Sequence, residues 1–372
     1  MFCFFGVFID VRGQFSEANG LVTFALNRPG ALNALNLPQV EHLQKEFVVL
    51  KSDKRCCGIL FVGEGEKAFC AGGDVLHIYN SSMLVSDDWN RRWFSNEFLL
   101  NWEISQFVKP IVSIWKGIVM GGGVGLSIYG SHRVATSNTI FAMPETGIGF
   151  FPDVGASWFL SHYVKNQPLG LYLGMTGHRL SGVDAYKFGL ATHYIELPQV
   201  EELLSELNTN CESSIDEILS RFHSEPHTSK FPQELITQIE EYFSPKTTFD
   251  EFWNKLKNGQ TEFAIETTKK IRKLCPLTVR VWFESFKLGA GQTLDQALAR
   301  EYNMCIQVTE KDARNFREGV RAQLIDKGKL APPKYVPSSI EETTNEMVNE
   351  IISSKIGGDL AECMRLGKLM YT

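Results

Sequence analysis

The segment PIVSIWKGIVMGGGVGLSIYGSHRVATSNTIFAM, residues 110–143, decides the fold class. It begins with an apolar run at 110–114 that is typical of a buried strand, and a glycine cluster then leads into a predicted helix that ends near Leu126. Two further short strands are predicted at 133–136 and 139–143. The order of strand, glycine turn, helix and further strands within one short segment indicates an α/β fold.

The same order of elements recurs along the first half of the chain. Strands are predicted at 21–26 and 58–62, and a helix at 87–108. Because the recurrence has no residue-level repeat, we interpret it as stacked turns, each of which covers the apolar edge of its neighbour. Farther along, glycine becomes rarer and apolar residues recur at helical spacing. We therefore predict a core over residues 1–198 and a mostly helical region over residues 199–372.

Composition narrows the class of function. The chain has 372 residues, with 37 Lys and Arg against 43 Asp and Glu, so its formal net charge is −6. That balance gives no general electrostatic reason to bind nucleic acid or an anionic membrane. Eight cysteines without a C-x-x-C pair suggest neither a disulfide scaffold nor a zinc site, and no histidine has metal-ligand spacing, so we expect no metal.

Three segments place polar or glycine residues in apolar surroundings: KAFCAGGD at 67–74, MGGGVG at 120–125 and MPETGIGFFPDVG at 143–155. The glycines of the first two can let backbone N–H groups approach a ligand, and two such groups that converge on one oxygen would form an oxyanion hole. The alternative is that the glycines serve tight packing or turns. Neither segment has the spacing of a dinucleotide or phosphate-binding loop.

The third segment holds Glu145 and Asp153 among many apolar residues. Carboxyl groups are unfavourable in such surroundings unless they are paired, hydrogen-bonded or functional, and desolvation would raise the pKa of one of them to suit acid–base chemistry. The alternative is a helix cap at Asp153 and a surface position for Glu145. Other nucleophiles have weaker support, because no G-x-S-x-G motif occurs and Cys70 is interpreted as a small buried filler.

Together with NRPGALNALN at 27–36 and MTGHRLSGVDAYKFGLATHYI at 175–195, these motifs occur in an order that resembles the crotonase (enoyl-CoA hydratase/isomerase) superfamily. The resemblance continues through FREGVRAQLIDK at 316–327 and covers nearly the whole chain. It implies a crotonase-like spiral of ββα turns with a mostly helical C-terminal extension. It also implies an acyl-CoA substrate and no cofactor, since CoA is part of the substrate.

The resemblance implies roles for particular residues. The backbone N–H groups of Gly73 and Gly122 would form an oxyanion hole around the thioester carbonyl. Glu145 and Asp153 match the catalytic acid pair of the superfamily, and Glu97 matches a glutamate that contacts the substrate. The two acids and Gly122 would also bind the substrate.

Two positions favour one branch of the superfamily. Hydratases carry a second glutamate where this chain has Gly125, and they usually have glycine where it has Asp153. Both departures favour the 3-hydroxyisobutyryl-CoA hydrolase branch, which hydrolyses the thioester of 3-hydroxyisobutyryl-CoA in valine catabolism, a part of branched-chain amino acid degradation. The alternatives are an acyl-CoA hydrolase or hydratase of different acyl specificity, and a structural subunit of the mitochondrial ribosome derived from this branch.

Location and assembly are expected from the resemblance alone. The branch is mitochondrial, with the cytoplasm as the alternative, and the first residues, MFCFFGVFID, show neither a secretory signal nor an Arg-rich presequence. We expect no membrane segment and no nucleic acid partner, and we leave a homo-oligomer open. Arg28 and Lys67 are candidates to bind the phosphates of CoA.

Overall fold

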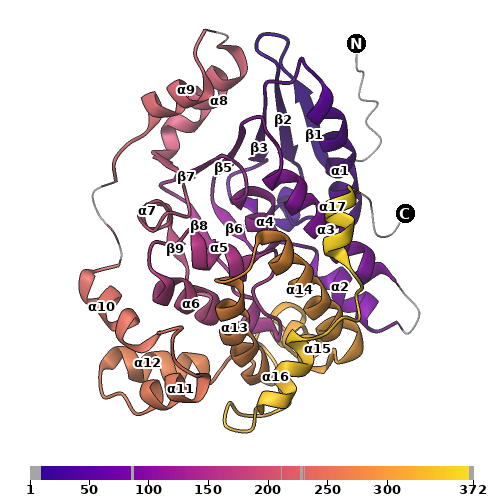
Figure 1. Cartoon of the computed structure of the whole chain (residues 1–372). Helices are drawn as coiled ribbons and strands as arrows, with labels where there is room; N and C mark the ends of the chain where they lie inside the picture. Colours follow the sequence, from indigo (N-terminus) through magenta and orange to yellow (C-terminus); the bar gives the residue numbers. More distant parts are fainter. Residues whose placement is uncertain (1–9, 85–87, 211, 227–228, 230, 368–372) are drawn as a thin grey trace. The chain divides into compact units, whose positions relative to one another are not determined.

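The fold is known from a computed structural model of the chain, in which residues 10–84, 88–210, 212–226, 229 and 231–367 are described (Figure 1). The chain divides into two compact units, each built from segments that alternate along the sequence. Unit 1 consists of Met1–Gly73, Leu100–Phe141 and Leu180–Lys230, and unit 2 consists of Asp74–Leu99, Ala142–Arg179 and Phe231–Thr372.

The two regions expected from composition, 1–198 and 199–372, stay a prediction. The change in composition marks where the strands end, because β10 (His193–Ile195) is the last strand of the described residues and the elements after it are helices. Local composition reflects secondary structure, whereas a compact unit depends on which segments pack together.

Unit 1 is built on a sheet of six strands in the order β1, β2, β3, β5, β7 and β10. Strands β1, β2, β3, β5 and β7 are labelled in Figure 1. Their bounds are β1 Val11–Phe15, β2 Leu21–Leu26, β3 Gly58–Gly63, β5 Ile111–Trp115, β7 His132–Thr136 and β10 His193–Ile195. β1 is antiparallel to β2, and the other neighbours are parallel. Parallel strands are covered on both faces, which explains their continuous apolar sequences. The strands predicted at 21–26, 58–62, 110–114 and 133–136 are confirmed to within one residue at each end.

A second, smaller sheet has the strand order β4, β6, β8 and β9. Its strands are β4 Ala68–Cys70, β6 Ile118–Met120, β8 Ile140–Ala142 and β9 Leu180–Ser181. Each of β3, β5 and β7 is followed along the chain by a strand of the smaller sheet and then by helical structure. This succession is the spiral of ββα turns that the sequence resemblance implied.

Helices α8 and α9 pack against the larger sheet of unit 1. The helices of this unit are α1 Leu37–Ser52, α4 Gly122–Ile128, α7 Gly182–Lys187, α8 Val200–Thr209 and α9 Ile215–Phe222, with 3-10 turns η1 Pro29–Ala31 and η3 Leu197–Gln199. Leu203 on α8 and Leu219 on α9 are fully buried in one cluster with Leu60 and Val134 of the sheet. The two helices therefore remove the apolar side of the parallel strands from water.

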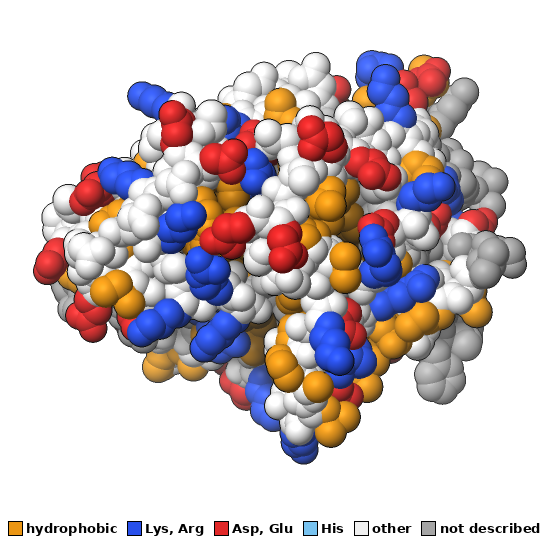
Figure 2. All heavy atoms as spheres, turned by 90° about the horizontal axis from the view of Figure 1, so that it is seen from below, with side chains coloured by type: hydrophobic (Ala, Val, Ile, Leu, Met, Phe, Trp, Pro, Cys, Tyr) orange, Lys and Arg blue, Asp and Glu red, His pale blue; other side chains and the backbone are white. Residues whose placement is uncertain are grey.

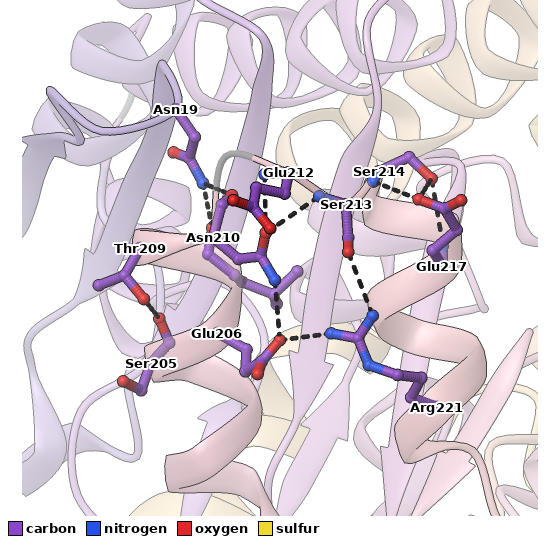
Figure 3. Close-up of polar contacts among 11 residues, drawn as sticks. Asn19, Ser205, Glu206, Thr209, Asn210, Glu212, Ser213, Ser214, Glu217 and Arg221 are labelled. Atoms are coloured by element: carbon purple, nitrogen blue, oxygen red, sulfur yellow. Dashed lines mark hydrogen bonds and ion pairs between the residues drawn. The ribbon is translucent and has the colours of Figure 1, made fainter.

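Polar contacts fix the turn between α8 and α9 (Figure 3). The side-chain amide of Asn19 donates to the carbonyl oxygens of Leu207, at 2.7 Å, and Asn210, at 3.0 Å. Ser214 and Glu217 then form a capping box that begins α9. These bonds tie the helix pair to the β1–β2 connection of the same unit.

Unit 2 is mostly helical. Its helices are α2 Val75–Ser82, α5 Ala156–His162, α6 Gln167–Thr176, α10 Gln233–Tyr242, α11 Phe249–Lys257, α12 Glu262–Ile271, α13 Pro276–Gly289, α14 Leu294–Ile306, α15 Arg314–Val320, α16 Asn345–Ile352 and α17 Leu360–Leu366, with the 3-10 turn η2 Glu145–Ile148 and the π-helical turns η4 Gln307–Lys311 and η5 Arg321–Ile325. α3 (Trp89–Ser105), which confirms the helix predicted at 87–108 within the described residues, runs from unit 2 into unit 1. The core of unit 2 includes Trp282 on α13, whose indole N–H donates to the carbonyl oxygen of Leu171 at 3.0 Å.

The surface of unit 2 carries charged pairs of opposite sign. Arg272 Nη2 lies 3.0 Å from Glu341 Oε1, and Lys269 Nζ lies 2.7 Å from Glu266 Oε1. On the face drawn in Figure 2, acidic and basic side chains are interspersed in the same way. Such mixing agrees with the small net charge of the chain.

Replacing Gly123 with alanine is expected to destabilise the protein by roughly 1–3 kcal/mol, the usual range for an overpacked core position. A Cβ at Gly123 would lie 2.3 Å from the carbonyl oxygen of Cys70 and 2.7 Å from its Cβ, so the backbone itself would have to move. Chemical denaturation measures the loss. Gly30→Ala is the matched control, because Gly30 is exposed and a Cβ there meets nothing within 4 Å. Equal stability of the two variants would contradict the prediction.

Candidate active site

Glu97, Glu145 and Asp153 come together in unit 2. Glu145 begins the turn η2, Asp153 precedes α5, and Glu97 lies on α3. All three residues are buried: Glu145 is 7% exposed, Asp153 6% and Glu97 3%. The charge of Asp153 acts on both glutamates, and that of Glu145 acts on Glu97, so the carboxyl groups form one cluster. We call these residues the acid cluster.

Burial and repulsion between like charges raise the pKa values of the acid cluster, so its carboxyl groups ionise at a higher pH than ordinary Asp and Glu side chains. The pKa of Asp153 is raised to about 8 by burial and then by the negative charge of Glu301. Burial is also the main cause that raises the pKa of Glu145 and of Glu97 well above the ordinary value of a glutamate, with repulsion from Asp153 as the next cause. Neutral and ionised carboxyl groups can therefore coexist near neutral pH, which suits proton transfer.

One oxygen of the acid cluster has no partner within the described chain. Glu145 Oε2 is buried and makes no hydrogen bond there. Buried polar atoms are satisfied in most proteins, and an orphaned carboxylate oxygen is typical of a site that binds a ligand or water. The interpretation of Glu145 as a surface residue is wrong, because the residue is 7% exposed.

The backbone from Glu145 to Val154 has an unusual shape. Gly149 has a φ of 70°, and a side chain at this position would meet the carbonyl oxygen of Asn315 at 2.0 Å. Val154 also has a positive φ, of 52°, which for a β-branched residue carries a strain of roughly 1–3 kcal/mol. Strain of this kind gathers at functional sites, where a side chain must be held in one direction.

Two residues beside Asp153 were not singled out in the sequence. Glu301 and Cys305 lie one turn apart on α14 and are fully buried. Cys305 Sγ lies 4.0 Å from Asp153 Oδ2, and burial raises the pKa of this thiol well above its ordinary value, so it stays neutral. The signal in the sequence is a four-residue spacing on an amphipathic helix, which is equally typical of a core position.

Gly73 and Gly122 lie on two loops of unit 1 that approach each other. A Cβ at Gly72 would lie 3.7 Å from the amide nitrogen of Gly122, and the Gly72 carbonyl oxygen accepts from Leu35 at 2.8 Å. Gly122 is the first residue of α4, where backbone N–H groups have no partner within the helix. Across the described residues, neither the Gly73 amide nor the Gly122 amide donates a hydrogen bond to the protein. Both amides are thus available to an oxygen atom of a ligand.

The remaining sequence candidates have simpler surroundings. Arg28 donates to the carbonyl oxygen of Ala34 at 2.7 Å and lies 3.4 Å from Asp10, so its charge is engaged within unit 1. Lys67 is exposed. Cys70 is fully buried and packs against Gly123, as expected of a small side chain that fills space in the core.

Among the described residues, no group of three or more His, Cys, Asp or Glu side chains is arranged to hold a metal ion. No helix in the same residues is both long enough and apolar enough to span a membrane.

The fold and the motifs define a class of protein. The chain belongs to the enoyl-CoA hydratase/isomerase family, whose family model matches residues 21–352. The superfamily resemblance of the sequence motifs is thereby confirmed, together with its α/β spiral fold.

Curated relatives within this family have a more specific name. The chain is 40% identical over 336 residues to 3-hydroxyisobutyryl-CoA hydrolase-like protein 1, mitochondrial, of Arabidopsis thaliana, a match that covers 88% of this chain and 82% of the relative. It is 38% identical to the mitochondrial 3-hydroxyisobutyryl-CoA hydrolase of Dictyostelium discoideum, over 90% of both chains. The enzyme of that name from Bos taurus is 36% identical, over 92% of this chain and 88% of the relative.

Solved structures of related proteins have the same fold. A carnitinyl-CoA dehydratase from Mycobacterium thermoresistibile superimposes with a TM-score of 0.84 and 32% identity, over 92% of this chain and 96% of that one. An enoyl-CoA hydratase from Rhodobacter sphaeroides has a TM-score of 0.81 and 28% identity, over 93% and 98% of the two chains. These neighbours carry acyl-CoA names for different reactions, so the fold alone does not select one reaction.

Proposed function

We propose that this chain hydrolyses the thioester of 3-hydroxyisobutyryl-CoA to 3-hydroxyisobutyrate and free CoA, as in valine catabolism. The observation that carries the proposal is the buried acid cluster, in which Glu145 and Asp153 lie together in a chain 36–40% identical to hydrolases of that name. The proposed reaction consumes one water molecule and uses no cofactor, because CoA enters as part of the substrate.

Glu145 is proposed to start the reaction in one of two ways. As a nucleophile, its carboxylate attacks the thioester carbon, the C–S bond breaks, CoA leaves as a thiolate that takes a proton, and water hydrolyses the resulting mixed anhydride. As a general base, Glu145 takes a proton from water while the water oxygen attacks, and the proton passes to the departing sulfur. Both routes need an ionised Glu145, and its orphaned Oε2 supports either one.

Asp153 is proposed to bind the hydroxyl group of the substrate or the attacking water, and Glu97 to contact the substrate. The raised pKa of Asp153, about 8, leaves it mostly protonated at neutral pH, so it can donate a hydrogen bond while another member of the acid cluster is ionised. Repulsion favours one negative charge in the acid cluster over two. This division of protons is the usual solution for carboxyl groups that share a site.

The amides of Gly73 and Gly122 are proposed to stabilise the oxyanion. Attack on a thioester places negative charge on the carbonyl oxygen, and amide donors that are already oriented lower the energy of that state. Their location on touching loops of unit 1, without protein acceptors in the described residues, supports this role.

A second candidate reaction is the elimination or addition of water at the acyl chain. The 32% identity to a carnitinyl-CoA dehydratase favours it, since that name also refers to an acyl-CoA. The chain has glycine at position 125. Hydratases of the superfamily that the sequence resembles carry a glutamate there, so Gly125 weighs against the hydratase reaction.

The two reactions give different products from one panel of short acyl-CoA esters. We expect 3-hydroxyisobutyryl-CoA to release free thiol faster than crotonyl-CoA or 3-hydroxybutyryl-CoA, measured with a thiol reagent. The matched control is the absorbance of the conjugated enoyl thioester, which should not change. Loss or gain of enoyl absorbance without thiol release would instead favour the hydratase reaction and overturn the proposal.

The mitochondrial location of the relatives supports a mitochondrial location for this chain as well. The proposed partner is an acyl-CoA substrate. A homo-oligomer stays a prediction.

A further inference from the structure

Glu301 on α14 accepts hydrogen bonds from the start of α5. The backbone N–H groups of Gly155 and Ser157 donate to its two carboxylate oxygens at 2.7 and 3.1 Å, and the Ser157 hydroxyl also donates. Arg300 donates to that same hydroxyl at 2.9 Å and to the Ser285 hydroxyl at 2.8 Å. Because the Ser157 oxygen accepts from Arg300, its hydrogen is directed to Glu301. Glu301 therefore accepts all of its bonds, as an ionised carboxylate does.

These bonds cap α5 from outside the helix. The N-cap residue of α5 is Gly155, which has no side chain that could accept from the first N–H groups. Glu301 takes over that task, although it lies far along the sequence. Asp153 immediately precedes the capped turn, and its carbonyl oxygen accepts from the Ala156 N–H at 2.9 Å. The contacts of Glu301 thus fix the backbone that carries Asp153.

The charge of Glu301 needs a separate explanation, because a neutral acceptor could cap the helix as well. A carboxylate that is 0% exposed is unfavourable, and the neighbouring Arg300 offsets only part of that penalty. The groups that face Asp153 from the other elements are Glu97, Glu145 and Cys305, and each of these can acquire only negative charge. Burial raises the pKa of Glu301 as well, but its oxygens only accept hydrogen bonds, as an ionised carboxylate does. When ionised, Glu301 opposes ionisation of Asp153, which in turn acts on Glu145 and Glu97.

We propose that Glu301 is a positioning residue for the thioester reaction, which anchors the backbone of Asp153 and places a negative charge behind the acid cluster. This inference rests on the proposed function. It assigns a role to a carboxylate on a helix of unit 2 that the sequence motifs did not include.

The test is Glu301→Gln, assayed for thiol release from 3-hydroxyisobutyryl-CoA across pH 5 to 9. We expect kcat to fall by about tenfold or more, because an amide offers N–H donors where the site needs acceptors. The acid limb of the pH profile should move to lower pH by about one unit, because the loss of a nearby like charge lets the acid cluster ionise more readily. A purely structural role would lower activity without moving the limb.

Ser157→Ala is the matched control. It removes the bond that the hydroxyl donates to Glu301 and the one that it accepts from Arg300, but it keeps the charge of Glu301 and both amide bonds, so its acid limb should stay within a few tenths of a pH unit of the wild type. Glu301→Asp keeps the charge but is shorter, so we expect a lower kcat with an unmoved limb. If Glu301→Gln does not fold, this pair still tests the proposal, since wild-type kcat in a folded Glu301→Asp protein would overturn the anchoring role.

Infrared titration gives a readout that needs no substrate. The band of protonated carboxyl groups should disappear at lower pH in Glu301→Gln than in the wild type. An unchanged band and an unchanged kcat in the folded variant would overturn the inference. If the wild type released no thiol from any ester, the proposed function would fail instead, and the infrared result would still decide whether Glu301 controls the acid cluster.

Discussion

Glu145→Gln is expected to lower kcat for thioester hydrolysis by at least ~10², the low end of the effect of a general base. The amide has nearly the same shape as the carboxyl group, but it can neither take a proton from water nor attack a carbonyl carbon. The measurement is thiol release from 3-hydroxyisobutyryl-CoA under saturating substrate. Glu266→Gln is the matched control, because Glu266 lies on the surface, where it pairs with Lys269, and should retain wild-type activity.

The stability of Glu145→Gln should equal or exceed that of the wild type. Glu145 is buried, and its Oε2 makes no hydrogen bond to the described residues, so a neutral amide removes the need to desolvate a charge. Thermal unfolding checks this point. A folded variant that turns over at the wild-type rate would remove Glu145 from the reaction.

Single turnover in heavy-oxygen water separates the two routes for Glu145. If Glu145 is the nucleophile and water attacks the Glu145 carbon of the mixed anhydride, heavy oxygen enters the Glu145 carboxyl group, where peptide mass spectrometry detects it. If Glu145 is the base, or if water attacks the acyl carbon of the anhydride, the label enters only the released acid. Label in Glu145 therefore establishes the nucleophilic route, and label in the released acid alone is the result expected for the general base.

Gly122→Pro is expected to lower kcat by ~10²–10³, the usual effect of losing one oxyanion donor. Proline removes the N–H group that a side-chain truncation cannot remove. Gly122 is the first residue of α4, a position at which proline is well tolerated because its missing N–H has no partner in the helix. The loss should therefore fall on the reaction more than on the fold.

Affinity for free CoA is the control for Gly122→Pro. CoA lacks the carbonyl oxygen that the amide would bind, so its dissociation constant should stay near that of the wild type. A folded variant with unchanged kcat would show that the Gly122 amide does not act on the carbonyl oxygen. A variant that loses CoA affinity and stability together would show that proline disturbs the loop.

The sequence singled out two members of the acid cluster, Glu145 and Asp153, more clearly than it explained the glycine loops. A carboxyl group surrounded by apolar residues has few satisfactory positions, so Glu145 and Asp153 stand out from the sequence alone. The glycine cluster at 120–125 had two interpretations, amides that bind a ligand and glycines required by tight packing. The structure supports a different interpretation at each of two neighbouring residues. Gly123 is required by close packing against Cys70, whereas Gly122 has an amide with no acceptor among the described residues.

Other features could not be read from the chain. Strands β4 and β6 have three residues each, too few for an alternating or apolar pattern to stand out. Glu301 lies on an amphipathic helix, where one acid among apolar neighbours gives no sign of the distant loop that it contacts. Its partners at Gly155 and Ser157 are more than 140 positions away, a separation that only tertiary structure can bridge.

The alternation of segments between the two units affects how the protein is made. A growing chain emerges from its N-terminus, so unit 1 is complete only after its last segment, which ends at Lys230, and unit 2 only at Thr372. Strands β2 and β3 are made early, but their covering helices α8 and α9 arrive much later. The nascent chain therefore carries uncovered apolar strands through much of its synthesis, a state that favours aggregation and makes binding by chaperones advantageous.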